Sequence, residues 1–335
     1  MLNIIDYIPE GFLEADATSL KTLLGSPTLI HLHGRRPEPL FVSVLLHGNE
    51  ITGLQAIQDL LRLYQQRELP RALSIFVGNI DAAEHGQRRL QGQPDYNRVW
   101  PGCDQRGFEE ALMMQQIIVE MRARKVFASI DVHNNTGINP HYSCINVVDD
   151  SFFHLATLFS RTVVYFTRPT GVQSSAFASL CPAVTIECGK VGQSYAEKHA
   201  TEFIDAALHL SEIPQHSFPE HDIDLFHTIA IVKVPDQLDF SFNGDASDIC
   251  FDSDIDHMNF HELKAGTRLA RSSGSDQVRL QAWNNDGIDI GDQLFVYDDN
   301  EICTSRALMP SMLTLNEKVI RQDCLCYLME RYTLK

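Results

Sequence analysis

The sequence has no hydrophobic run long enough to cross a bilayer, since its longest apolar runs are short stretches such as residues 41–46. Its N-terminus lacks a basic segment followed by an apolar one, so we expect no signal peptide. It contains no internal repeat and no low-complexity tract. With 44% hydrophobic and 21% charged residues over 335 positions, the chain can bury a large core. We therefore expect a globular protein of the cytoplasm.

Basic residues are scarce. The chain has 27 Lys and Arg against 44 Asp and Glu, which gives a formal net charge of -17. Partners that require a basic surface, namely nucleic acids and anionic membranes, are therefore not expected. A small anionic substrate stays compatible with this charge, because a few clustered arginines can reverse the local potential.

Cysteine is not rare, but its pattern does not indicate a disulfide scaffold. Eight cysteines in a chain of this size, without a secretory signal, predict reduced thiols. The nearest pair, Cys324 and Cys326, resembles a metal site only weakly, because no second pair lies nearby. We therefore interpret it as core packing.

The first two-thirds of the chain alternates short apolar runs with helical patterns, which predicts an α/β fold with a mainly parallel sheet. The predicted strands are Phe41–Leu46, Ser74–Val77, Phe127–Asp131, Thr162–Phe166 and Ala183–Glu187. The predicted helices are Ile51–Gln66, Gly107–Arg124 and Ala196–Leu210.

A stretch rich in proline and histidine, Ile213–Asp224, indicates a linker. Short β-type runs follow it, at Ala230–Val234, Val278–Trp283 and Gln293–Tyr297. We therefore predict an α/β domain over residues 1–220 and a small β-rich domain, a barrel or sandwich, over 221–335.

The first chemical signal is His47-Gly48-Asn49-Glu50, at the end of an apolar strand and the start of a helix. This is the edge at which α/β sheets place ligands. The next is Asp131-Val132-His133, at the end of another predicted strand. His47, Glu50 and His133 would give three metal ligands and an open position for water, as in catalytic zinc sites. Asp131 could orient a ligating imidazole. The alternative is that these histidines cap helices or pack in the core.

Metal-activated water needs a base. Glu187 ends an apolar run that should be buried, where an unpaired carboxylate would be costly. It could face the metal and accept a proton, or it could pair with Lys190 at the sheet edge. A loop with Arg88, Arg89, Asn97 and Arg98 could bind carboxylate and carbonyl groups, or could be a solvated surface loop.

Taken together, these segments resemble the succinylglutamate desuccinylase/aspartoacylase family of the zinc-carboxypeptidase-like superfamily. The family's stretches H-G-N-E, G-N-P-x-A, R-Y…D-x-N-R, D-L-H and E-x-G correspond here to residues 47–50, 78–83, 89–98, 131–133 and 187–189. Ile80 replaces the family's proline, and the R-Y…D-x-N-R segment carries one extra residue. Stretches at residues 258–267 and 313–318 extend the likeness into the C-terminal third.

The resemblance implies a mixed, mainly parallel sheet flanked by helices, with a C-terminal β-rich domain that narrows the active-site entrance. It implies one zinc ion per chain held by His47, Glu50 and His133, with Glu187 as general base and acid. It also implies that Arg89 stabilises the oxyanion and that Arg89, Asn97 and Arg98 bind a small anionic N-acyl amino acid or related amide.

Two departures concern the substrate. The family's arginine about ten residues before the catalytic glutamate falls near Phe177, so Arg168 is our candidate for its role. The position of a substrate-binding tyrosine in the C-terminal domain of aspartoacylase falls near Asn300, where this chain has no tyrosine. Tyr297 is close by in the sequence.

Three functions fit this sequence. The first is a zinc-dependent deacylase of N-acyl amino acids. The second is a metallocarboxypeptidase acting on short peptides, and the third is a zinc- or ligand-binding protein without catalysis. The candidate base favours an enzyme. A homo-oligomer is compatible with the sequence.

Overall fold

The computed structural model describes residues 1–103, 107–242, 244, 247–274 and 277–334. The chain divides into two compact units, one formed by Met1–Asn134 and His141–Leu225 and the other by Asn135–Pro140 and Phe226–Lys335. The predicted boundary lay between residues 220 and 221. The sequence did not indicate that the short segment after Asn134 belongs to the second unit.

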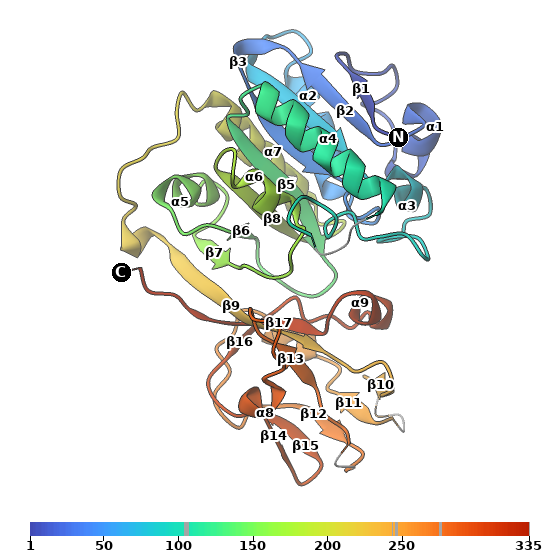
Figure 1. The fold of residues 1–335 in the computed structure, drawn as a ribbon, viewed down its shortest axis with the longest axis vertical. Coiled ribbons are helices and arrows are strands. Elements are labelled where there is room, and N and C mark those ends of the chain that lie inside the picture. Colours follow the sequence, from blue (N-terminus) through green and yellow to red (C-terminus); the bar gives the residue numbers. More distant parts are fainter. Residues whose placement is uncertain (104–106, 243, 245–246, 275–276, 335) are drawn as a thin grey trace. The chain divides into compact units, whose positions relative to one another are not determined.

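The first unit is built on a mixed sheet whose strand order is β1-β2-β4-β3-β5-β8-β6-β7 (Figure 1). The strands are β1 (Asn3–Ile5), β2 (Thr28–Leu32), β3 (Gly34–Val44), β4 (Leu69–Val77), β5 (Ala128–Asn135), β6 (Tyr142–Ile145), β7 (Thr162–Tyr165) and β8 (Ala183–Lys190). The pairs β1/β2, β3/β4, β3/β5 and β6/β7 are parallel, whereas β2/β4 and β6/β8 are antiparallel. The predicted mainly parallel sheet is therefore confirmed.

Strands β5 and β8 continue beyond the ends that the sequence predicted, which were Asp131 and Glu187. The prediction was wrong there because a polar residue after an apolar run indicates a strand end only when that residue faces solvent. Every residue of β5 is buried, polar ones included, and β8 is buried up to Gly189. In β5 the buried side chains of Asp131 and His133 contact each other, so a polar run continues as strand.

Helices cover both faces of this sheet. They are α1 (Leu20–Leu24), α2 (Thr52–Leu63), α3 (Ile80–Glu84), α4 (Glu109–Ala123), α5 (Asp150–Ala156), α6 (Gln173–Phe177) and α7 (Ser194–His209). Figure 1 shows α4 on one face and α2 and α7 on the other, and α2 packs against α7. The three long helices were predicted to within a few residues, but the short ones have too few turns to show a periodic apolar stripe.

The second unit is rich in β structure, as predicted. One sheet joins β13 (Gln281–Trp283), β9 (Asp224–Lys233), β17 (Cys326–Arg331) and β16 (Met309–Ser311). The other joins β10 (Phe240–Ser241), β11 (Ile249–Phe251), β12 (Arg268–Ser272), β15 (Glu301–Thr304) and β14 (Phe295–Asp298). Residues from both sheets share one apolar core. The helices are α8 (Gly291–Leu294) and α9 (Glu317–Gln322), and α8 occupies the start of the predicted strand Gln293–Tyr297.

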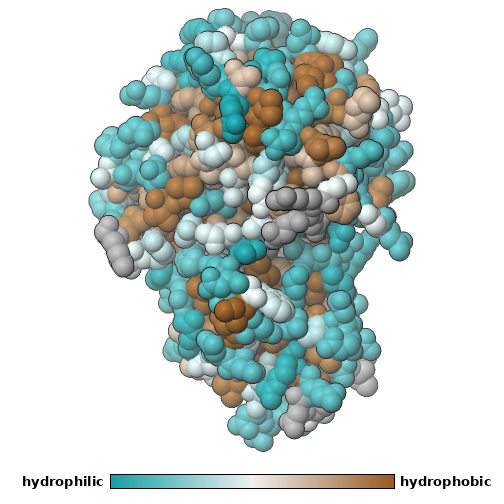
Figure 2. Space-filling model, in the orientation of Figure 1, coloured by the Kyte–Doolittle hydropathy of each residue, from teal (hydrophilic) through white to brown (hydrophobic). Residues whose placement is uncertain are grey.

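On the face shown in Figure 2, hydrophilic side chains predominate and hydrophobic ones form separate patches. All eight cysteines are free thiols, in agreement with the sequence. In the part of the chain that the structure describes, none of the helices combines the length and apolar character needed to cross a bilayer.

Candidate metal centre and active site

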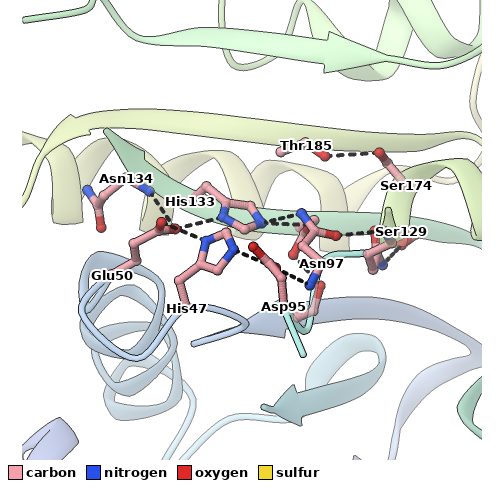
Figure 3. Close-up of polar contacts among 12 residues, drawn as sticks. His47, Glu50, Asp95, Asn97, Ser129, His133, Asn134, Ser174 and Thr185 are labelled. Atoms are coloured by element: carbon pink, nitrogen blue, oxygen red, sulfur yellow. Dashed lines mark hydrogen bonds and ion pairs between the residues drawn. The ribbon is translucent and has the colours of Figure 1, made fainter. Parts of the chain in front are cut away.

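The structure brings the three predicted metal ligands together. His47 and Glu50 lie in the loop between β3 and α2, and His133 lies in β5, which pairs in parallel with β3. One ligand atom from each residue lies within 4.8 Å of the others, and all three residues are buried (Figure 3). The parallel pairing explains this convergence, because the carboxyl ends of both strands meet at one sheet edge.

Both imidazoles present Nδ1 to Glu50 and Nε2 to a second carboxylate, although their ring planes are tilted by 59° to each other. Nδ1 of His47 lies 2.7 Å from Oε1 of Glu50, and Nδ1 of His133 lies 2.6 Å from its Oε2. The opposite nitrogens face carboxylates: Nε2 of His47 is 3.0 Å from Asp95 Oδ1, and Nε2 of His133 is 2.8 Å from Asp131 Oδ2. Asp95 and Asp131 can each hold a ring proton on Nε2, so that Nδ1 would serve a metal ion that displaces its own proton.

This donor set fits zinc. Two imidazole nitrogens and one carboxylate oxygen, buried and close together, match the three protein ligands of catalytic zinc sites. The carboxylates behind both rings are the supporting partners that metal-ligating histidines usually have. The sequence predicted that Asp131 orients an imidazole of this site, and Asp131 does contact His133 in this structure. For Asp95 it predicted no such role.

The charges in the site depend on one another. Burial alone would raise the pKa of the Glu50 carboxyl, but His47 and His133 hold it well below its usual range. Burial opposes protonation of His133, yet Asp131 and Glu50 raise its pKa well above the usual value. The carboxylate at the centre is therefore ionised at neutral pH, which is the state that binds a cation.

Asn97 supports Asp131 instead of facing outward. Its Nδ2 donates to Asp131 Oδ2 over 3.2 Å, and its Oδ1 accepts from the backbone N–H of Gln173 over 2.8 Å. Ser43 Oγ donates to the other oxygen of Asp131 over 2.7 Å. Asn97 is only 7% exposed, and it holds Asp131, which in turn contacts His133. Its predicted contact with substrate stays a prediction.

The two neighbouring arginines of the next loop have different partners. Arg88 reaches the metal site, with Nη1 3.4 Å from Glu50 Oε1 and Nη2 3.1 Å from Asp95 Oδ2. Arg89, the predicted oxyanion-stabilising residue, donates from Nη1 to the backbone oxygen of Gln93 over 2.9 Å. The predicted role of Arg89 stays a prediction, while Arg88 is the one of these two arginines that contacts the carboxylates around the candidate metal site.

The loop that carries these arginines is anchored by a pair of amides. Asn79 and Gln93 exchange two hydrogen bonds, of 2.9 and 3.1 Å, and Asn79 Oδ1 also caps α3 by accepting from Ala82 N–H. The backbone N–H of Gly48 donates to the oxygen of Arg88 over 3.1 Å. The G-N-x-x-A and H-G-N-E stretches are thus neighbours in the fold, and both fix the position of the arginine loop.

Arg98 and Arg168 come from segments that pack together. Arg98 donates to the backbone oxygen of Asn97 over 2.8 Å. Gly171, three residues after Arg168, is so near the oxygen of Arg98 that an added Cβ would lie 2.4 Å from it. The backbone N–H of Trp100 also donates to Gly171 over 3.0 Å. Binding of a substrate carboxylate by these arginines stays a prediction.

Phe177, where the family has an arginine, and Tyr297, close to the position of the family's tyrosine, both have structural roles. Phe177 is fully buried and stacks on Phe41, with ring centroids 4.4 Å apart, so it belongs to the core. The Tyr297 hydroxyl accepts from the backbone N–H of Leu280 over 2.9 Å, and Arg279 covers its ring. Tyr297 thus has an internal role in the second unit, where its hydroxyl already has a partner.

Glu187, the candidate base, lies in β8, the neighbour of β5. It is 5% exposed. Burial raises the pKa of this carboxyl to about 7, while His133 lowers it and Glu50 raises it. A group with this pKa can both accept and release a proton near neutral pH.

The fold and the site define a class of protein, an α/β unit with a mainly parallel sheet flanked by helices, a β-rich second unit, and a buried His-Glu-His cluster at the sheet edge. The model of the succinylglutamate desuccinylase/aspartoacylase catalytic domain matches residues 39–212, just over half of the chain. The chain therefore belongs to the succinylglutamate desuccinylase/aspartoacylase family, whose members are N-acyl amino acid deacylases. This confirms the resemblance inferred from the sequence.

Solved structures show the same fold at low sequence identity. The succinylglutamate desuccinylase from Chromobacterium violaceum is 17% identical, with a TM-score of 0.58 over 90% of this chain and 86% of that one. Murine aminoacylase 3 is 12% identical, with a TM-score of 0.58 over 89% and 96%. The product-bound ectoine utilization protein from Ruegeria pomeroyi is 14% identical, with a TM-score of 0.56 over 91% and 88%. A search of the curated proteins found no match.

Several residues of the site have no role that the sequence pattern indicates. Asp95 and Arg88 were part of the arginine-rich loop that it singled out, but no residue spacing showed which carboxylate would face His47 or which guanidinium would face Glu50. Ser43 lies inside an apolar strand, where a lone serine carries no signal.

Proposed function

We propose that this protein is a zinc-dependent hydrolase that cleaves the amide bond of a small N-acyl amino acid. One zinc ion per chain would be held by His47, Glu50 and His133. The observation that carries this proposal is the convergence of these three buried ligands, with a carboxylate behind each imidazole, in a chain of a deacylase family.

The residues around the ligands fit the steps of amide hydrolysis. A bound zinc ion supplies a Lewis acid for the acyl carbonyl and lowers the pKa of water. Glu187 takes the proton of the attacking water and passes it to the leaving nitrogen, for which its raised pKa is suited. While the water attacks, and before the leaving nitrogen departs, a guanidinium of the arginine loop stabilises the negative charge that develops on the carbonyl oxygen.

An anionic substrate is consistent with the cations near this site. Arg88 lies at the ligands, and the segments of Arg98 and Arg168 pack against each other in the first unit. The chain is acidic overall, so these arginines would provide a local positive potential that attracts a substrate carboxylate. We expect the enzyme to act in the cytoplasm, alone or as a homo-oligomer.

The test is the release of amine from a panel of N-acyl amino acids by zinc-loaded protein, with a chelator-treated sample as control. The panel combines succinyl, acetyl and longer acyl groups with Glu, Asp and neutral amino acids. Chelator-sensitive release from one group would support the proposal and define the specificity. Removal of C-terminal residues from peptides, without action on the panel, would replace it with a carboxypeptidase.

Glu187→Gln tests the assigned base. We expect the variant to bind zinc as the wild type does and to lose turnover by about 10²- to 10⁴-fold, because the amide cannot accept the proton. Zinc content and kcat are measured on the same preparations. Glu202→Gln, an exposed change on α7, is the matched control and should retain full activity. Wild-type turnover by Glu187→Gln would contradict the assignment.

A further inference from the structure

Asn134 is a buried asparagine that hydrogen-bonds to the segments carrying the candidate metal ligand and the candidate base. It follows the ligand His133 in β5 and is 6% exposed. It makes three hydrogen bonds to residues of the same unit, one through its backbone and two through its side chain. Figure 3 shows it beside Glu50.

The first two of these bonds act on the turn that carries Glu50. The backbone N–H of Asn134 donates to Glu50 Oε2 over 3.2 Å, the oxygen that also faces His133 Nδ1. Its side-chain Oδ1 accepts from the backbone N–H of Thr52, the first residue of α2, over 3.3 Å. The N-cap residue of α2, Ile51, provides no side-chain hydrogen bond. Asn134, which lies in β5, therefore acts as a partner for one of the free N–H groups at the N-terminus of α2.

The third bond acts on the strand of the candidate base. Asn134 Nδ2 donates to the backbone oxygen of Gly189 over 3.1 Å. Gly189 lies two residues after Glu187 and has a φ of +68°, a conformation that favours glycine. The Asn134 amide therefore holds β8 at Gly189, where the backbone departs from extended geometry two residues after Glu187.

We propose that Asn134 is a positioning residue that sets the ligand Glu50 and the base Glu187 at their places relative to each other. It acts through these carboxylates and does not touch the reacting atoms. This inference rests on the proposed function. Because the side chain bridges α2 and β8, its removal would take this partner from the Thr52 N–H and from the Gly189 oxygen at once, while the backbone bond to Glu50 stays.

The test compares Asn134→Ala with Gln58→Ala. Gln58 is also a buried amide and also makes two side-chain hydrogen bonds, to the backbone oxygens of Phe12 and Ala15, but it lies further along α2. The measurements are the zinc dissociation constant, by competition with a chromophoric chelator, and kcat and KM at saturating zinc. We expect Asn134→Ala to weaken zinc binding about 10- to 100-fold. We also expect kcat to fall at least about 10-fold, with KM changed less than about threefold, and Gln58→Ala to alter neither.

Asn134→Asp distinguishes the bond to Thr52 from the bond to Gly189. It also replaces the alanine variant in the test if that variant does not fold. Its carboxylate can still accept from Thr52, but it cannot donate to Gly189. We therefore expect kcat to fall as in the alanine variant, with a smaller loss of zinc affinity.

Wild-type zinc affinity and kcat in Asn134→Ala, or losses equal to those of Gln58→Ala, would overturn the inference. If the wild-type protein binds zinc but hydrolyses no member of the panel, the proposed function is refuted. The inference on Asn134 is then still tested by the zinc dissociation constants of the variants. Wild-type protein without zinc affinity would refute both.

Discussion

Arg88 and Arg89 are adjacent in the chain, yet only the first has its guanidinium against carboxylates of the metal site. Two arginines on one loop cannot be separated by residue type, because both can form charge-assisted hydrogen bonds. What separates them is the direction in which the loop presents each side chain. At the scale of single residues, the role of the oxyanion-stabilising arginine is therefore a question of orientation.

We expect Arg88→Ala to lower kcat about 10²- to 10³-fold, the usual effect of removing one donor from a developing oxyanion. Arg89→Ala should change kcat less than Arg88→Ala, since its guanidinium contacts the backbone oxygen of Gln93. The measurement is steady-state kinetics on the best substrate of the panel. The reverse ranking would return the role to Arg89, as the sequence suggested.

At the scale of elements, the ligand loop and α3 are in very close contact. A Cβ added at Gly48 would lie 2.2 Å from the backbone nitrogen of Ala83, closer than real Cβ contacts. Backbone atoms cannot rotate away as side chains can, so the loop or the helix would have to move. This contact explains why a glycine stands between His47 and Glu50.

Gly48→Ala should therefore lower the free energy of unfolding by about 1–3 kcal/mol, the usual cost of overpacking, and should also weaken zinc binding. Gly78→Ala provides a graded comparison, because its added Cβ would lie 3.0 Å from the oxygen of Leu45. Urea unfolding of both variants gives the ranking. Equal stabilities for Gly48→Ala and the wild type would show that the loop and α3 can separate at little cost.

The stability of the whole molecule should depend on pH through His31. This residue lies in β2, is 7% exposed, and has its Nδ1 2.8 Å from Ser74 Oγ. Burial, together with the charge of Arg124, lowers the pKa of its imidazole from 6.5 to about 4. The unfolded chain therefore binds a proton between these values and the folded chain does not, so stability is lost as the pH falls from 6.5 towards 4.

Between pH 7 and pH 5 this single group should cost about 2 kcal/mol of folding free energy. His31→Gln, which can still pair with Ser74, should lose less stability over that interval than the wild type. Urea unfolding at both pH values measures the difference. His85→Gln, at an exposed position, should show the wild-type dependence. An unchanged dependence in His31→Gln would show that other groups cause the acid sensitivity.

Much of this protein was predictable because it is encoded in short stretches. The continuous apolar runs of β3, β5 and β8 indicate strands buried on both faces, and the apolar stripe of α2 indicates a helix. Because ligands gather at the carboxyl ends of parallel strands, His47, Glu50 and His133 could be assigned to one site before the fold was known. Composition alone indicated a large core and an acidic surface.

The tertiary structure decided what depends on direction and on distant partners. It paired His47 with Asp95, turned Arg88 and not Arg89 towards Glu50, and placed Asn134 between α2 and β8. These assignments depend on side-chain orientation across elements far apart in the chain, which no local periodicity encodes. The sequence by itself determined which residue types meet at the sheet edge, and the packing of strands, helices and loops determined which atom of each faces which partner.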